Sequence, residues 1–146
     1  MPRQSRAVVL DDGLLIEELL VGLPKGSTEI HTTSYWYYRA CRAAALGAGG
    51  HLSGPFDELG EGQQREAIVS LLELREDILL PDPRTTVPAM VRFAGRYPHL
   101  NLLNLEAVAL GDHLGATLWL SPESANGVLP GILDLEDIGW RTVTFE

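Results

Sequence analysis

The chain has 146 residues, 45% of them hydrophobic, which fits one globular domain over residues 1–146 with a sizeable core. Its net charge of −9 disfavours nonspecific binding to nucleic acid, whose phosphates require basic neutralisation. The single cysteine, Cys41, excludes a disulfide within the chain and favours a reducing, cytoplasmic location. The polar start, residues 1–6, lacks the apolar stretch of a signal peptide, and no apolar run approaches the roughly 18 residues of a membrane span. We therefore expect no membrane association.

Hydrophobic periodicity predicts that strands and helices alternate along the chain. Apolar or alternating runs predict strands at residues 7–10, 28–33, 116–121 and 140–145, with at most a short strand over 78–83. Helical spacing predicts helices over 12–22, 34–48, 61–75, 85–97 and 100–114, a short helix or loop over 126–139, and a loop over 47–55. We expect Ser34 to cap the second helix and Gly115 to close the fifth. The inward face of the third helix is predicted to be Ala67, Ile68, Leu71, Leu72 and Leu74.

Strands separated by helices predict a three-layer α/β/α sandwich with a mostly parallel central sheet. In such sheets, ligands bind beyond the carboxyl ends of the strands. Asp11 and Asp12 directly follow the first predicted strand, at the start of a helix. The pair is therefore either a helix cap or the corner of a metal site, and the sequence leaves both interpretations open.

Two segments resemble PIN domains, a family of metal-dependent ribonucleases. The segment "VVLDDGLL", residues 8–15, is similar to the family's opening strand and turn. The segment "NLEAVALGDHLGATLWLS", residues 104–121, is similar to its helix, Leu-Gly-Ala turn and following strand. The resemblance spans nearly the whole chain and implies a PIN-like fold. It also implies that three or four carboxylates at the edge of the sheet hold Mg²⁺ or Mn²⁺, which activates water for RNA cleavage.

The carboxylate positions of the family are only partly filled. The first matches Asp11, the catalytic candidate if the protein is active, and Asp12 stands where the family has Thr, Ser or Ala. The second position has no acid in the helix that follows residues 28–33, and the third falls on the amide Asn104. Glu106 and Glu123 lie near the third and fourth positions, two residues and one residue late. The resemblance thus gives Asp11, Asp12, Glu106 and Glu123 as metal candidates, and we expect Asp11, Asp12 and Asn104 to share one cleft.

Two functions are compatible with this pattern. The first is a PIN-like protein with a depleted metal site that holds Mg²⁺ or Mn²⁺ weakly and acts through binding or regulation of RNA or a small protein partner. The second is an active Mg²⁺- or Mn²⁺-dependent ribonuclease with a rearranged site, such as the toxin of a toxin–antitoxin pair. The amide at position 104 favours the first, because a neutral side chain is a poor ligand for Mg²⁺.

The aromatic run "SYWYYR", residues 34–39, also has two interpretations. Tyr35 and Trp36 would stack on nucleic-acid bases while Arg39 contacts a phosphate. Alternatively, at least two of the four aromatics point into the core or into a subunit interface, because consecutive residues face nearly all directions around a helix. The amount of aromatic surface predicts a homodimer. Four arginines either line a groove or lie on solvated helix faces: Arg39, Arg42, Arg92 and Arg96.

Overall fold

A computed structural model describes residues 6–23, 26, 28–46 and 60–144, and at its centre lies a five-stranded sheet. The strands lie in the order β3–β2–β1–β4–β5, and every neighbouring pair among these five is parallel. Their bounds are β1 Ala7–Leu10, β2 Glu29–Thr32, β3 Ile78–Leu79, β4 Thr117–Leu120 and β5 Trp140–Thr142. The predicted α/β class and parallel sheet are confirmed.

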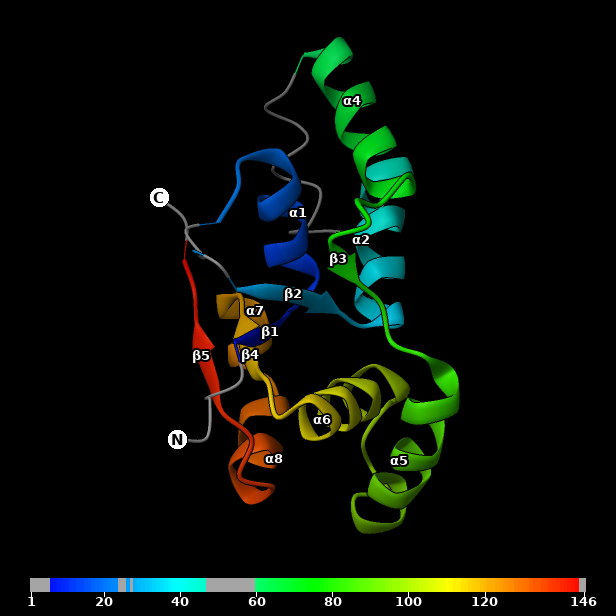
Figure 1. Ribbon diagram of the computed structural model, residues 1–146, viewed down its shortest axis with the longest axis vertical. Coiled ribbons are helices and arrows are strands. Elements are labelled where there is room, and N and C mark those ends of the chain that lie inside the picture. The colour runs from blue at the N-terminus through cyan, green and yellow to red at the C-terminus, as the bar shows by residue number, and fades with distance from the viewer. Residues whose placement is uncertain (1–5, 24–25, 27, 47–59, 145–146) are drawn as a thin grey trace.

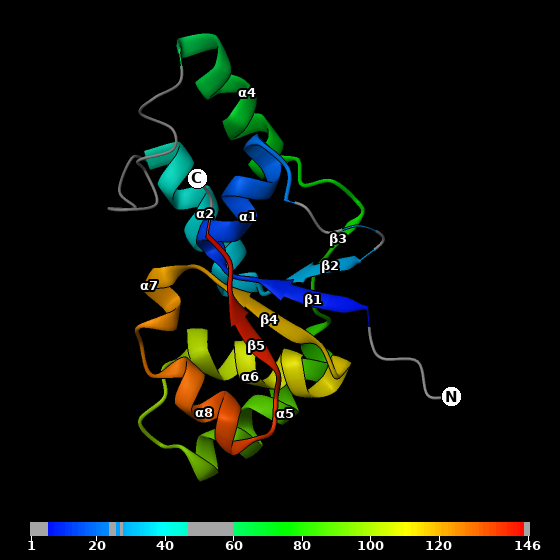
Figure 2. The same cartoon turned by 90° about the vertical axis from the view of Figure 1, so that its left-hand side faces the viewer.

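Helices cover both faces of the sheet. In Figures 1 and 2, α1, α2 and α4 lie on one side of the strands, and α5, α6 and α8 lie on the other. The helix bounds are α1 Asp12–Leu20, α2 Ser34–Leu46, α4 Glu61–Leu72, α5 Pro83–Arg96, α6 Leu102–Leu114, α7 Pro122–Ala125 and α8 Leu129–Leu135. The predicted three-layer α/β/α sandwich is therefore also confirmed.

The central strand β1 supplies both halves of the core. All four of its residues are buried, as is typical of a parallel strand covered on both faces. Val8 and Leu10 pack in the cluster formed with α1, α2 and α4, whereas Val9 packs in the cluster formed with α5, α6 and α8. The chain leaves β1 for β2 on one side, while β4 pairs with β1 on the other. The carboxyl ends of β1 and β4 thus form a topological switch point, where parallel sheets bind ligands.

Helix ends agree with the sequence in some places and differ in others. Gly115 closes α6 in the left-handed conformation with φ of 60°, as predicted. Ser34 is not the cap of α2: it is the first helical residue, and the Oγ1 of Thr33 accepts from the backbone N of Trp36 at 3.0 Å. Leu72 does not face inward but is 58% exposed, because the buried residues of α4 are Ala67 and Leu71, and Leu72 is turned about 100° around the helix from Leu71.

The remaining boundaries shift by a few residues. α1 ends at Leu20 and α4 at Leu72, while the predicted short strand over 78–83 is limited to Ile78–Leu79. The loop predicted over 47–55 lies outside the described residues. In the part of the chain that the structure describes, no helix is both long enough and apolar enough to span a bilayer.

Candidate functional site

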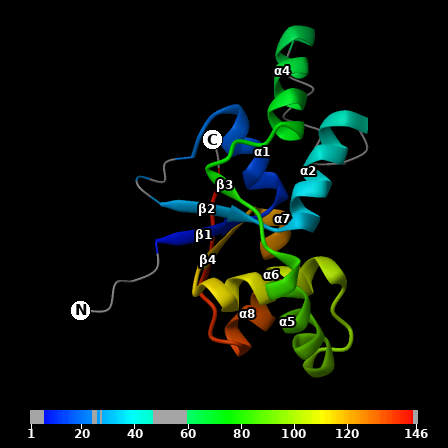
Figure 3. The same ribbon diagram turned by 45° about the vertical axis from the view of Figure 1, so that its right-hand side comes forward.

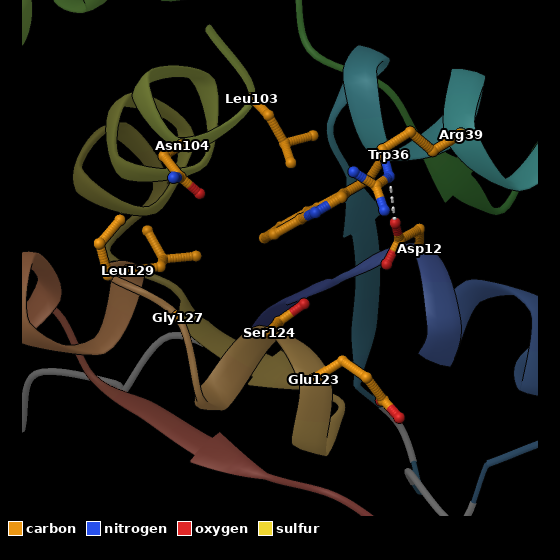
Figure 4. A pocket seen from close by; sticks show the side chains of 10 residues that line it. Asp12, Trp36, Arg39, Leu103, Asn104, Glu123, Ser124, Gly127 and Leu129 are labelled. Carbon is orange, nitrogen blue, oxygen red and sulfur yellow. Dashed lines mark ion pairs between the residues drawn. The ribbon is translucent and has the colours of Figure 1, made fainter. Parts of the chain in front are cut away.

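A cleft of about 200 Å³ opens at the switch point between the carboxyl ends of β1 and β4. Its polar and aromatic lining comes from four helices (Figure 4): Asp12 from α1, Trp36 and Arg39 from α2, Asn104 from α6, and Glu123 and Ser124 from α7. Leucines and the loop before α8 complete the wall. The cleft therefore collects residues that lie more than 100 positions apart in the sequence.

Asp11 does not line this cleft, because it lies fully buried beneath it. Its Oδ1 accepts from the backbone N of Leu14 at 2.9 Å, which makes it the N-cap of α1. Its Oδ2 accepts from the backbone N and the Oγ of Ser121, at 2.8 Å and 2.6 Å. The carboxylate thus ties the start of α1 to the end of β4, and both of its oxygens are engaged by the protein's own donors.

Asp12 is the acid that faces the cleft, and Arg39 neutralises it. The Nε of Arg39 lies 2.7 Å from Asp12 Oδ2, as the dashed line in Figure 4 marks, and Asp12 Oδ1 accepts from the backbone N of Gly13 at 2.8 Å. Burial raises the pKa of Asp12, and repulsion from Asp11 raises it further, whereas Arg39 acts in the opposite direction. The side chain of Arg39 is 45% exposed and that of Asp12 is 5% exposed, so the ion pair lies at the edge of the cleft with the arginine on the solvent side.

Glu106 lies outside the cleft and caps α2 from a neighbouring helix. Its Oε2 accepts from the backbone N of Ser34 and its Oε1 from the backbone N of Tyr35, both at 2.9 Å. Thr33 supplies the acceptors for the next two amides of α2. A carboxylate at a helix N-terminus also interacts favourably with the helix dipole. The buried charge of Glu106 is therefore accounted for by the fold.

The other two predicted site residues, Asn104 and Glu123, both line the cleft. Asn104 comes from the first turn of α6, and its side-chain amide points toward the cleft in Figure 4. Glu123 is exposed on the short helix α7, and its carboxylate points away from Asn104. The structure thus brings Asp12, Asn104 and Glu123 to one cleft, and places Asp11 and Glu106 in separate hydrogen-bond networks outside it.

The fit of Mg²⁺ or Mn²⁺ depends on which of these donors are available. A hard cation requires several oxygen ligands around one point. Both oxygens of Asp11 and of Glu106 accept backbone amides, and Asp12 is paired with Arg39. Among the described residues, no three His, Cys, Asp or Glu side chains gather as a cation site. The donor set does not fit the arrangement that the resemblance implies, because a cation at Asp12 would have to displace a guanidinium.

The aromatic run of α2 is divided between the core and the surface. Trp36 is 2% exposed and Tyr37 donates from its hydroxyl to the carbonyl of Leu71 at 2.6 Å, so two aromatics point inward as expected. Tyr35 is 39% exposed and lines a different groove, beside α5. Of the predicted nucleic-acid contacts, Trp36 and Arg39 thus line the cleft, whereas Tyr35 lines the separate groove.

The four arginines do not line one groove. Arg39 pairs with Asp12, Arg92 with Asp112 at 3.3 Å and Arg96 with Glu136 at 2.5 Å, while Arg42 is exposed on α2. These ion pairs fit the solvated helix faces that the sequence offered as the second interpretation.

Three residues of this region were not predicted from the sequence. Ser121 is the partner of Asp11, Ser124 lines the cleft and Thr33 caps α2. Ser121 and Ser124 follow β4 in the run "LSPES", so their position after a strand was the only available indication.

A scan of protein-family models finds none that matches this chain, and a search of curated proteins finds no match. The resemblance to PIN domains therefore rests on the two segments at residues 8–15 and 104–121.

Proposed function

We propose that the protein is a PIN-like domain that binds a ligand or partner and does not cleave RNA efficiently. The fold class is compatible with this proposal, because a parallel sheet with helices on both faces places a cleft at the switch point. The family and the activity are carried by the resemblance of residues 8–15 and 104–121 and by the state of the carboxylates.

One observation carries the proposal: three of the four candidate carboxylates serve the fold. Asp11 holds α1 to β4, Glu106 caps α2 and Asp12 is neutralised by Arg39. Metal-assisted hydrolysis depends on ligands that hold the cation before the substrate arrives. A site that does not hold the cation loses transition-state stabilisation, and a loss of about 4 kcal/mol corresponds to a rate about a thousandfold lower.

The test is cleavage of a single-stranded RNA panel with Mg²⁺ or Mn²⁺. Wild type is compared with Asp12→Asn and Glu123→Gln, which alter the cleft without removing the buried caps. We expect all three proteins to cleave at the background rate. Efficient cleavage by wild type that both variants abolish would overturn the proposal.

The second candidate function is the active ribonuclease, and one observation favours it. Asp12 and Glu123 line the same cleft as Asn104, so two acids and an amide surround one small volume, into which the Glu123 carboxylate would have to turn. A rearranged site would use these residues after Arg39 has moved away. Calorimetric titration with Mn²⁺ separates the two functions: we expect weak binding by wild type and tighter binding by Asn104→Asp. Wild-type binding as tight as that of Asn104→Asp would favour the nuclease.

The partner and the location are part of the same proposal. We propose a cytoplasmic protein that forms a homodimer and engages RNA or a small protein partner. The single cysteine supports the cytoplasm, and exposed apolar side chains such as Val91 and Leu102 support association. The net charge of −9 favours a protein partner over RNA.

A further inference from the structure

Arg39 brings a positive charge to the place where the resemblance to PIN domains implies a divalent cation. The helix α2 lies beside α1 on one face of the sheet (Figure 3), so Arg39 can face the first turn of α1. Figure 4 shows its guanidinium extending from α2 over the carboxylate of Asp12, and its Nε lies 2.7 Å from Asp12 Oδ2. The cleft therefore contains a cation that belongs to the chain itself.

The two acids that follow β1 are stabilised in different ways. Asp11 accepts from three neutral donors, which are Leu14 N and the N and Oγ of Ser121. Asp12 is paired with Arg39, and in the described ranges no other ion pair involves either carboxylate. Burial and repulsion from Asp11 raise the pKa of Asp12, and the charge of Arg39 lowers it. Arg39 thus stabilises the Asp12 carboxylate as a bound metal ion would.

Arg39 and a metal ion would compete for the same carboxylate. Asp12 Oδ1 accepts from the backbone N of Gly13 at 2.8 Å and Oδ2 contacts Arg39, so both oxygens are engaged. A divalent ion on Oδ2 would also lie against a guanidinium of like sign. This repulsion is weakly screened, because the side chain of Asp12 is only 5% exposed. Binding of Mg²⁺ or Mn²⁺ at Asp12 therefore requires that Arg39 leaves.

The other polar residues of the cleft do not shift this competition toward a metal ion. Asn104 is neutral, and the exposed carboxylate of Glu123 points away from it in Figure 4. One guanidinium balances the single carboxylate that faces the cleft, whereas a divalent ion would add an excess of positive charge beside Arg39. The amide at position 104 and the arginine at position 39 therefore act in the same direction.

We infer that Arg39 determines the cation specificity of the cleft: in the free protein its guanidinium takes the place of the divalent ion and closes the cleft to Mg²⁺ and Mn²⁺. The inference rests on the proposed function, because it names the residue that keeps the PIN-like site from holding a metal ion. The side chain of Arg39 is 45% exposed, so it can be replaced without disturbing the core. Its loss leaves the buried Asp12 carboxylate without a cation.

Calorimetric titration of the full chain with Mn²⁺ tests this role. Arg39→Met keeps an unbranched apolar stem and removes the charge, and we expect it to bind Mn²⁺ at least about tenfold more tightly than wild type. The matched control is Arg42→Met, which removes the same charge from an exposed residue one turn further along α2 and is expected to bind as weakly as wild type. Combining Asp12→Asn with Arg39→Met is expected to abolish the gain.

Urea unfolding followed by circular dichroism provides a second measurement on the same proteins. An ion that binds the folded state raises the unfolding midpoint. We expect Mn²⁺ to raise the midpoint of Arg39→Met and to leave those of wild type and Arg42→Met unchanged. A midpoint of wild type that rises with Mn²⁺ would overturn the inference even if Arg39→Met failed to fold.

The outcomes separate this inference from the proposed function, because Mn²⁺ binding is measured without RNA. If Arg39→Met binds Mn²⁺ no more tightly than wild type and wild type does not cleave RNA, the role of Arg39 is wrong and the proposed function stands. If wild type cleaves RNA efficiently although only Arg39→Met binds free Mn²⁺ tightly, the proposed function is wrong and Arg39 still controls the cleft of the free protein.

Discussion

Replacing Asp11 with asparagine tests whether this buried acid holds the fold together. The carboxylate accepts three hydrogen bonds, one from Leu14 N and two from Ser121. The asparagine oxygen can keep the bond to Leu14 N, but its amide nitrogen then faces the backbone N–H of Ser121. A buried donor without an acceptor costs about 1–3 kcal/mol, and bonds to a charged acceptor are stronger than neutral ones by about 1 kcal/mol. We therefore expect the free energy of unfolding to fall by about 2–4 kcal/mol, a large part of the roughly 5–15 kcal/mol of a typical domain.

Urea unfolding followed by circular dichroism measures this loss, and Asp12→Asn is the matched control. The substitution is chemically identical and one residue away, but it breaks an ion pair with a half-exposed arginine, which is worth about 0–1 kcal/mol. It also removes the cost of burying a charge beside Asp11. We expect the control to lose about 1 kcal/mol or less. Equal losses in the two variants, or a loss below about 0.5 kcal/mol in Asp11→Asn, would refute the role of Asp11 as the tie between α1 and β4.

Glu106, Asp12 and Cys41 give three further tests of the structure. Glu106→Gln is expected to lower the free energy of unfolding by about 1–3 kcal/mol, because an amide nitrogen then faces an amide of α2, whereas the exposed Glu123→Gln changes it by less than about 0.5 kcal/mol; equal effects would contradict the cap. The pKa of Asp12 is raised above its ordinary value of 3.8, so the folded state binds this proton more tightly, and its stabilisation is lost as the pH rises through the raised pKa. The free energy of unfolding of wild type should therefore fall relative to that of Asp12→Asn as the pH increases from 3.8. Urea unfolding at several pH values measures this, and a difference between the two proteins that does not change with pH would contradict the raised pKa. Burial raises the pKa of the Cys41 thiol, so folded protein should react with iodoacetamide more slowly at neutral pH than protein unfolded in urea, and equal rates would be inconsistent with a packed thiol.

The fold was predictable because its signals are local. The apolar run at residues 7–10 and the helical spacing after Asp12 give β1 and α1 with correct starts, and Gly115 marks the end of α6. The cap of α2 was placed one residue late, because Thr33 and Ser34 both have a suitable hydroxyl and only the backbone conformation distinguishes them. Leu72 was placed inward although it follows the buried Leu71 by one residue, which turns it about 100° around the helix and away from the core.

The site was less predictable, because its partners are far apart in the sequence. Asp11 meets Ser121 across 110 positions, and Glu106 meets Ser34 across 72. Spacing alone cannot show that a carboxylate is already an acceptor of such bonds. Position in the chain did indicate that Asp12 lies beyond the end of a central strand, and the structure places that residue in the cleft.

The bond between Asp11 and Ser121 also has a consequence for how the chain folds. Every strand pair in the described sheet is parallel, so each pairing needs a crossover and none can form as a local hairpin. During synthesis, the first strand emerges long before its neighbour β4, and Asp11 cannot acquire its second set of donors until more than four fifths of the chain has been made. Loop closure over such distances slows folding, so refolding of this protein should be slow for its size. The N-terminal strand, with all four residues destined for burial, can pair with β2 early, but its other edge stays open until β4 has been made and is exposed to aggregation until then.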